Sequence, residues 1–186
     1  MMNRDECFHA LARHIGDAIV VAAYSSALEW QDLYPRDLNY YSIGAMGLGS
    51  SHALGLALAR PERRVVVLDG DGSLLMNLSS LVSIAAAAPK NLVHFVCHNE
   101  CYEANGGHQI ANPKTDFANL AKSAGYKHTY DFAELKSFEQ QVGHVLSQEG
   151  PVFGTLHIQK NRPLKYEYKD LYKESRRVAL RKALSA

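Results

Sequence analysis

Residues 64–76 read RVVVLDGDGSLLM, and this stretch decides the fold class. Residues 65–68 are apolar on both faces and mostly β-branched, which is typical of a parallel strand covered by helices on each side. Two glycines around Asp71 end the strand, and the apolar run from Leu74 predicts a helix. The stretch therefore predicts a strand, a tight turn and a helix, the unit that builds parallel α/β sheets.

Similar patterns lie on both sides of this unit. Residues 91–97 (NLVHFVC) are apolar on both faces, residues 18–23 (AIVVAA) form a weaker run, and a late strand is predicted over residues 152–158. Helices are predicted between and around these strands, over residues 48–60, 74–88, 117–124 and 133–147. Strands that alternate with helices of this length predict an α/β fold, a doubly wound parallel sheet with helices on both faces.

The composition excludes several classes of protein. A length of 186 residues suits one domain with a real core, and three cysteines do not make a disulfide framework. A formal net charge of +1 argues against a nucleic-acid partner. The N-terminus lacks an apolar signal segment, and no apolar run approaches the roughly 18 residues of a membrane span. We expect a cytoplasmic protein that binds neither nucleic acid nor membrane.

Charge divides the chain into two parts. Residues 160–186 hold nine Lys or Arg and three Asp or Glu, whereas residues 1–159 are mildly acidic. We therefore expect a folded domain over residues 1–159 and a basic helical tail over residues 160–186. The tail is interpreted either as a solvated final helix or as a segment that docks on another subunit.

The turn after the first strand has features of a ligand site. Ligands of parallel α/β sheets bind outside the carboxyl ends of the strands, where Gly70, Asp71 and Gly72 fall. Ser73 suits a helix N-cap, and free N–H groups there favour a phosphate. Asp71 would repel that phosphate unless a cation lay between them, so the turn predicts a Mg²⁺–diphosphate site. An ordinary Gly- and Asp-rich turn is the alternative interpretation.

The next strand end supplies a second oxygen ligand. Asn99 follows residues 91–97 and lies 28 positions after Asp71, a spacing that accommodates one helix and one return strand. Such a crossover places the two strand ends side by side, so Asp71 and Asn99 could share one metal ion.

These motifs resemble those of thiamine diphosphate (ThDP) enzymes. The family's signature is G-D-G, about 25 residues and an asparagine pair; here Gly70-Asp71-Gly72 is followed by 25 residues and then by His98-Asn99. His98 replaces the first asparagine, and Asn99 keeps the second, which is usually the metal ligand. The segment Gly44-Ala45-Met46-Gly47 matches an upstream turn of the family. In its order of motifs the chain is similar to the diphosphate-binding (PP) domain over most of residues 4–158.

The resemblance implies a role for each matched position. Mg²⁺ would be bound by Asp71, by Asn99 and by the backbone carbonyl of Cys101. The carbonyl of Gly44 would accept a hydrogen bond from the 4′-amino group of ThDP, and Met46 would be the apolar wedge that bends the cofactor. The remaining cofactor-binding positions, around the diphosphate, are Gly70, Gly72, Ser73, Tyr102, Ser25 and Ser26.

The resemblance also implies a partner. ThDP enzymes need a glutamate from a pyrimidine-binding (PYR) domain, and one PP domain uses up the 186 residues of this chain. We therefore expect a hetero-oligomer in which a PYR-domain (α) subunit supplies the catalytic Glu.

Some segments are similar to one subgroup of the family, the sulfopyruvate and phosphonopyruvate decarboxylases. They are residues 44–48, residues 70–78 with Ser80-Leu81, and residues 105–107. The likeness implies decarboxylation of a small 2-oxoacid such as 3-sulfopyruvate or 3-phosphonopyruvate. Gln109 comes one position later than in the subgroup, which leaves the substrate open. A subunit of an acetolactate synthase-like carboligase, or a non-catalytic ligand-binding or scaffold subunit, is the alternative.

Two histidines are candidate catalytic residues. His108 lies in a Gly-rich loop near the predicted site and suits substrate contact or proton transfer. His98 could donate to a reacting group or orient the cofactor, and it is equally well interpreted as a hydrogen-bonded histidine at a strand end. A zinc site of His94, Cys97, His98 and Cys101 is disfavoured, because His94 and His98 share one strand face and Cys97 points to the other.

Overall fold

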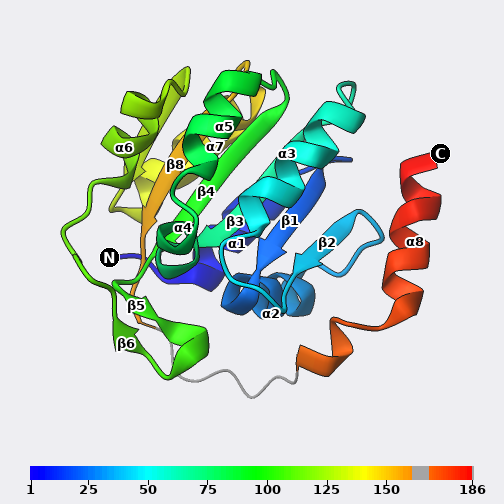
Figure 1. Cartoon of the computed structure of the whole chain (residues 1–186), viewed down its shortest axis with the longest axis horizontal. Helices are drawn as coiled ribbons and strands as arrows, with labels where there is room; N and C mark the ends of the chain where they lie inside the picture. The colour runs from blue at the N-terminus through cyan, green and yellow to red at the C-terminus, as the bar shows by residue number, and fades with distance from the viewer. Residues whose placement is uncertain (161–167, 186) are drawn as a thin grey trace.

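The chain folds around one six-stranded sheet in the computed structural model, which describes residues 1–160 and 168–185 (Figure 1). The strand order is β2-β1-β3-β4-β8-β7, and every neighbouring pair is parallel. The strands are β1 (Ile19–Ala23), β2 (Asn39–Ser42), β3 (Val65–Gly70), β4 (Leu92–His98), β7 (His128–Phe132) and β8 (Val152–His157). The predicted parallel sheet is confirmed, and its four central strands are the four that the apolar runs predicted.

Helices cover both faces of this sheet, which confirms the doubly wound arrangement (Figure 1). One face packs against α1 (Arg4–Ala12), α2 (Tyr24–Leu33) and α7 (Leu135–Ser147) through a core that includes Phe8, Trp30 and Phe138. The other face packs against α3 (Gly49–Ala59), α4 (Asp71–Met76), α5 (Ser80–Ala87) and α6 (Phe117–Ala124) through a second core that includes Leu74, Ile84 and Phe117.

The helix after β3 differs from its prediction. Helix α4 begins at Asp71, directly after Gly70, so Ser73 lies inside the first turn and the expected N-cap role of Ser73 is wrong. The single helix predicted over residues 74–88 is in fact two helices, because the helical conformation ends at Met76 and resumes at Ser80. At the break the side-chain amide of Asn77 donates to the carbonyl of Gly47 at 2.9 Å. A tertiary contact therefore sets this boundary, which helix periodicity alone does not reveal.

A small hairpin follows β4 at the same end of the sheet. Strands β5 (Cys101–Tyr102) and β6 (His108–Gln109) pair antiparallel around the short helix η1 (Glu103–Asn105). Tyr102 lies opposite His108 in this hairpin. The hairpin carries the residues that were predicted after Asn99, so it forms one wall of the candidate site.

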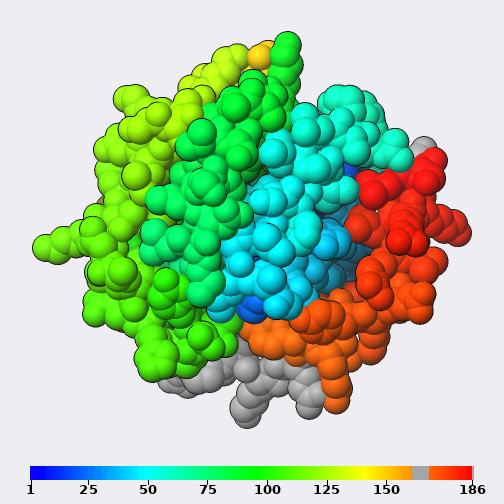
Figure 2. Space-filling model, viewed as in Figure 1, coloured from blue at the N-terminus to red at the C-terminus, as the bar shows by residue number. Residues whose placement is uncertain are grey.

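The described part of the C-terminal tail packs on the body of the chain. It comprises η2 (Tyr168–Asp170) and α8 (Glu174–Ser185), whereas residues 161–167 and 186 of the predicted tail lie outside the described residues. Leu171 and Leu180 are buried, and Arg176 donates to Gln31 at 2.6 Å. In Figure 2 the surface dips where α8, in red, meets the neighbouring elements. Helix α8 therefore contacts the body of the chain through one side, while most of its residues stay exposed, and its docking on another subunit stays a prediction.

One further expectation concerns membranes. Within residues 1–160 and 168–185, none of the helices has the length and apolar character needed to cross a bilayer.

Candidate functional site

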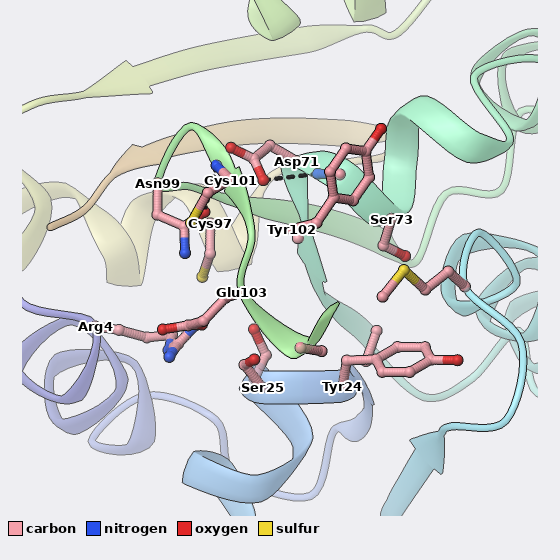
Figure 3. A pocket seen from close by; sticks show the side chains of 16 residues that line it. Arg4, Tyr24, Ser25, Asp71, Ser73, Cys97, Asn99, Cys101, Tyr102 and Glu103 are labelled. Carbon is pink, nitrogen blue, oxygen red and sulfur yellow. Dashed lines mark hydrogen bonds and ion pairs between the residues drawn. The ribbon is translucent and has the colours of Figure 1, made fainter. Parts of the chain in front are cut away.

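A pocket that contains several polar side chains opens at the carboxyl ends of β1, β3 and β4 (Figure 3). Strands β3 and β4 pair with Gly70 opposite Cys97, so the residues that follow the two strands lie side by side. This is the edge at which parallel sheets bind ligands. The lining contains most of the residues predicted from the sequence: Ser25, Ser26, Met46, Gly70, Asp71, Gly72, Ser73, Asn99, Cys101 and Tyr102.

Asp71 is the charged centre of the pocket, and its side chain is held from three directions. Its Oδ1 accepts the backbone N–H of Gly72 at 2.6 Å. Its Oδ2 accepts the backbone N–H of Glu100 at 2.7 Å and contacts Nδ1 of His98 at 2.9 Å. Only 1% of the Asp71 surface is exposed, so these bonds replace most of its water shell.

His98 supports Asp71 and does not line the pocket. Its Nε2 lies 3.0 Å from the carbonyl oxygen of Pro113, and its Nδ1 faces the Asp71 carboxylate. The ring therefore lies between a carboxylate oxygen and a carbonyl oxygen, both of which accept hydrogen bonds. Burial lowers the pKa of His98, but the hydrogen bond and charge of Asp71 and the Pro113 carbonyl outweigh it and raise the pKa. The geometry fits a residue that orients Asp71, and contact of His98 with a reacting group stays a prediction.

The oxygens of Asp71 and Asn99 have room for a divalent cation. An ionised carboxylate offers about four acceptor sites, and the three contacts above use three of those on Asp71. The amide oxygen of Asn99 accepts the N–H of Cys101 at 3.1 Å and keeps its second lone pair. Hard oxygen ligands of this kind suit Mg²⁺, which usually retains several waters as well. The residues present therefore fit the predicted metal.

The opposite wall brings small polar groups to the same space. Ser73 accepts the backbone N–H of Gly47 at 3.1 Å, which ties α4 to the turn that contains Met46. Gly72 packs so closely on Tyr102 that a Cβ at this position would lie 2.4 Å from the ring atom Cδ1. Only glycine therefore fits beneath this ring, a requirement that the G-D-G motif did not explain by itself.

Besides His98, two predicted residues lie outside the pocket lining. Gly44 has φ +100°, and a Cβ there would lie 3.0 Å from the hydroxyl of Tyr172 in the C-terminal segment. His108 is exposed on β6, opposite Tyr102. Contacts of Gly44 with the cofactor and of His108 with a substrate stay predictions.

Sequence reasoning missed three ionic residues at this site. Arg4 of α1 is paired through Nε with Glu29 of α2 and through Nη1 with Glu103 of η1, the latter at 2.7 Å. Arg4 and Glu103 line the pocket. Burial, which by itself lowers the pKa of Arg4, is outweighed by its two carboxylate neighbours, so the pKa is raised. The partners lie 25 and 99 positions away, and no spacing rule links residues so far apart.

Tyr24 was also missed. It lines the pocket at the start of α2 with φ +48°, a left-handed conformation that is unusual for an aromatic residue. Burial raises its pKa, and the backbone of Gly44 contributes an opposing hydrogen bond. Tyr24 therefore lies at the end of the pocket that is nearest to the 44–47 turn.

The fold and pocket together define a class of protein, an α/β domain with a pocket around a buried carboxylate at the carboxyl edge of a parallel sheet. Residues 15–154 match the family described as "Thiamine pyrophosphate enzyme, C-terminal TPP binding domain". The chain belongs to this family of ThDP enzymes, thiamine pyrophosphate being another name for ThDP.

Individual relatives agree with this assignment. Sulfopyruvate decarboxylase subunit beta of Methanothermobacter thermautotrophicus is 36% identical over 159 residues, which cover 85% of this chain and 83% of that protein. Phosphonopyruvate decarboxylase of Streptomyces viridochromogenes is 37% identical over 141 residues, which cover 76% of this chain and only 35% of that protein. The chain thus spans about a third of the second relative and most of the first.

A solved structure shares the fold. Benzoylformate decarboxylase from Polynucleobacter necessarius superposes with a TM-score of 0.75 at 21% identity, over 87% of this chain and 34% of that one. At this identity the likeness concerns the fold alone.

Proposed function

We propose that this chain is the β subunit of a two-subunit, ThDP- and Mg²⁺-dependent 2-oxoacid decarboxylase with a substrate like sulfopyruvate or phosphonopyruvate. The observation that carries the proposal is that Asp71 and Asn99 line one pocket at the carboxyl ends of the adjacent strands β3 and β4. The likeness to a sulfopyruvate decarboxylase subunit beta over most of both chains supports the substrate class.

The chain's own residues would bind the cofactor at its diphosphate end. Asp71, Asn99 and the carbonyl of Cys101 would hold Mg²⁺. The diphosphate would lie among the backbone N–H groups of Gly72, Ser73 and Tyr102, next to Gly70, Ser25 and Ser26. Met46 and the carbonyl of Gly44 would hold the rings. ThDP supplies the nucleophilic carbon and the electron sink for decarboxylation.

The part of this chain in catalysis would be to hold the metal ligands and the cofactor in position. His98 holds Asp71 in one orientation through Nδ1, and the Pro113 carbonyl fixes the ring from the other side. Tyr102 packs directly on Gly72 and fixes the position of that wall. These contacts keep the metal ligands in place before the cofactor binds, so little ordering is left for the bound state.

The catalytic glutamate would come from a partner. Glu103 is the one glutamate among the described residues that line the pocket, and Arg4 holds its Oε2 at 2.7 Å. A carboxylate engaged in this way is poorly suited to protonate a cofactor ring. We therefore place that glutamate on a PYR-domain (α) subunit, in a hetero-oligomer with this chain.

The test is co-purification followed by a substrate comparison. The tagged chain is purified from its native lysate with ThDP and Mg²⁺, and the complex is assayed with sulfopyruvate, phosphonopyruvate and pyruvate. We expect an α subunit of similar size and CO₂ release with the highest kcat/KM on an anionic 2-oxoacid. Asp71→Asn should abolish this activity, whereas Asp131→Asn, an exposed residue paired with His157, should preserve it.

Other outcomes would contradict the proposal. A chain that purifies alone and stays inert with ThDP would favour a scaffold or binding role. Formation of a coupled acyloin or acetolactate product would favour a carboligase. Higher kcat/KM on plain pyruvate than on both anionic analogues would refute the substrate class.

A further inference from the structure

Arg4 carries a buried donor that the fold leaves unused. Its guanidinium is 2% exposed, yet Nη2 has no hydrogen-bond partner among the residues that the structure describes. Nε is taken by Glu29 and Nη1 by Glu103. A buried N–H group that stays unpaired is costly, more so on a charged side chain, and a native fold rarely tolerates it without a ligand or water. The observation points to a group that binds there.

The position of Arg4 in the pocket indicates which part of the ligand would pair with Nη2. Figure 3 shows Arg4 reaching the pocket from α1 at the end opposite Tyr24, with Asp71 on the wall that faces them both. Tyr24 contacts the backbone of Gly44, so the Tyr24 end is the side of the 44–47 turn where the cofactor's rings are proposed to lie. A diphosphate centred on Asp71 would then point its outer phosphate toward Arg4.

Chemistry favours an anionic oxygen as the partner of Nη2. Arginine presents donors in a rigid fork that suits phosphate oxygens, and such charge-assisted bonds are the stronger class. Glu29 and Glu103 together outweigh the single charge of Arg4, so the guanidinium contributes a directed hydrogen bond more than a surplus of positive charge. The second unpartnered atom at this end, Oε1 of Glu103, is an acceptor that a water on Mg²⁺ can satisfy.

We propose that Arg4 is a cofactor-binding residue whose Nη2 donates to the terminal phosphate of ThDP, with Glu29 and Glu103 holding the guanidinium in place. This inference rests on the proposed function. It also gives α1, which lies outside the recognised motifs, a direct part in the site. Selectivity for the diphosphate over a monophosphate follows, because only the diphosphate reaches Arg4.

The test compares two ligands that differ by one phosphate. Affinities of the full chain, with any subunit that co-purifies, are measured by calorimetry for ThDP and for thiamine monophosphate at saturating Mg²⁺. Arg4→Lys keeps the charge and removes the fork. We expect its ThDP affinity to fall about tenfold or more, the loss of one charge-assisted hydrogen bond, while monophosphate affinity changes less than about threefold.

A matched control is the arginine that directly follows α1. Arg13 of the segment after α1 forms an exposed ion pair with Glu139 at 2.8 Å, so Arg13→Lys should change neither affinity. If Arg4→Lys does not fold, the triple variant Arg4→Met, Glu29→Gln and Glu103→Gln removes all three charges together and is compared in the same way.

Two results would overturn the inference. Equal losses for both ligands would mean that Arg4 only fastens η1 and α2 to α1, and unchanged affinities would mean that it does not contact the cofactor. Both leave the proposed function intact. A wild-type chain that binds neither ligand would overturn the inference and the proposed function together.

Discussion

The contact between Gly72 and Tyr102 makes a quantitative prediction for Gly72→Ala. A Cβ at residue 72 would lie 2.4 Å from Cδ1 and 2.6 Å from Cε1 of Tyr102. Carbon atoms in contact stay about 3.5–4.0 Å apart, so the ring must retreat by roughly 1 Å. Overpacking of this kind costs about 1–3 kcal/mol, while alanine in a helix regains about 0.5–1 kcal/mol relative to glycine. We expect a net loss of up to about 2.5 kcal/mol in the free energy of unfolding.

Gly55→Ala is the matched control. Gly55 lies in α3 with nothing within 4 Å of its missing Cβ, so alanine there should stabilise the chain by the helix gain alone. The difference between the two variants then isolates the Tyr102 clash at about 1–3 kcal/mol, or a few to about 12 °C in Tm for a chain of this size.

Urea denaturation of both variants measures this difference, and calorimetry with ThDP and Mg²⁺ measures its effect on the site. Displacement of the Tyr102 ring changes the shape of the pocket that it lines. The Gly72→Ala variant should therefore also bind ThDP at least about tenfold more weakly, a change of about 1.4 kcal/mol in binding free energy. The reasoning fails if Gly72→Ala matches Gly55→Ala in stability and matches the wild type in ThDP affinity.

Three further predictions follow from the site and the core. ThDP with Mg²⁺ at about 100 times its Kd should stabilise the wild type by about 2.7 kcal/mol, roughly 5–10 °C in Tm, and Asp71→Asn should lose this shift; a retained shift contradicts the metal assignment. Cys7, Cys97 and Cys101 are buried, and burial raises their pKa values, that of Cys97 to about 12. A thiol reagent at pH 8 should therefore label all three only in urea, and fast native labelling would refute the burial. Because these thiols ionise earlier in the unfolded chain, near pH 9, than in the folded chain, stability should fall as pH rises from about 9 toward 12; urea midpoints that do not change over this range would contradict it.

The central sheet could be predicted from the sequence because its strands are buried on both faces. Strands β3 and β4 are continuous apolar runs, and their parallel pairing places Asp71 and Asn99 together by geometry alone. The edge strands β2 (NYYS) and β7 (HTYDF) were missed, because each is short, polar and only partly buried. The apolar pattern of a sequence reveals a strand through its buried residues, and each of these edge strands has too few buried residues to be recognised.

At the site too, only the residues with a local sequence pattern could be predicted. Residues within one motif, such as Gly70 to Ser73, were found because a local turn has a local signature. Arg4 was missed because its two partners lie on other elements, and only the folded chain brings them together. Ser73 is not the N-cap because Gly70, whose backbone is extended, already takes that position at the start of α4.

The packing of α8 beside β2 has a consequence for solubility. Strand β2 is the last strand on its side of the sheet, and an uncovered edge offers backbone groups with which another chain can pair. Helix α8 lies along this edge with Leu180 buried and carries several positive charges. A chain shortened at residue 160 would keep the residues of the cofactor pocket but expose its edge, and it should self-associate and aggregate at concentrations at which the full chain stays dispersed.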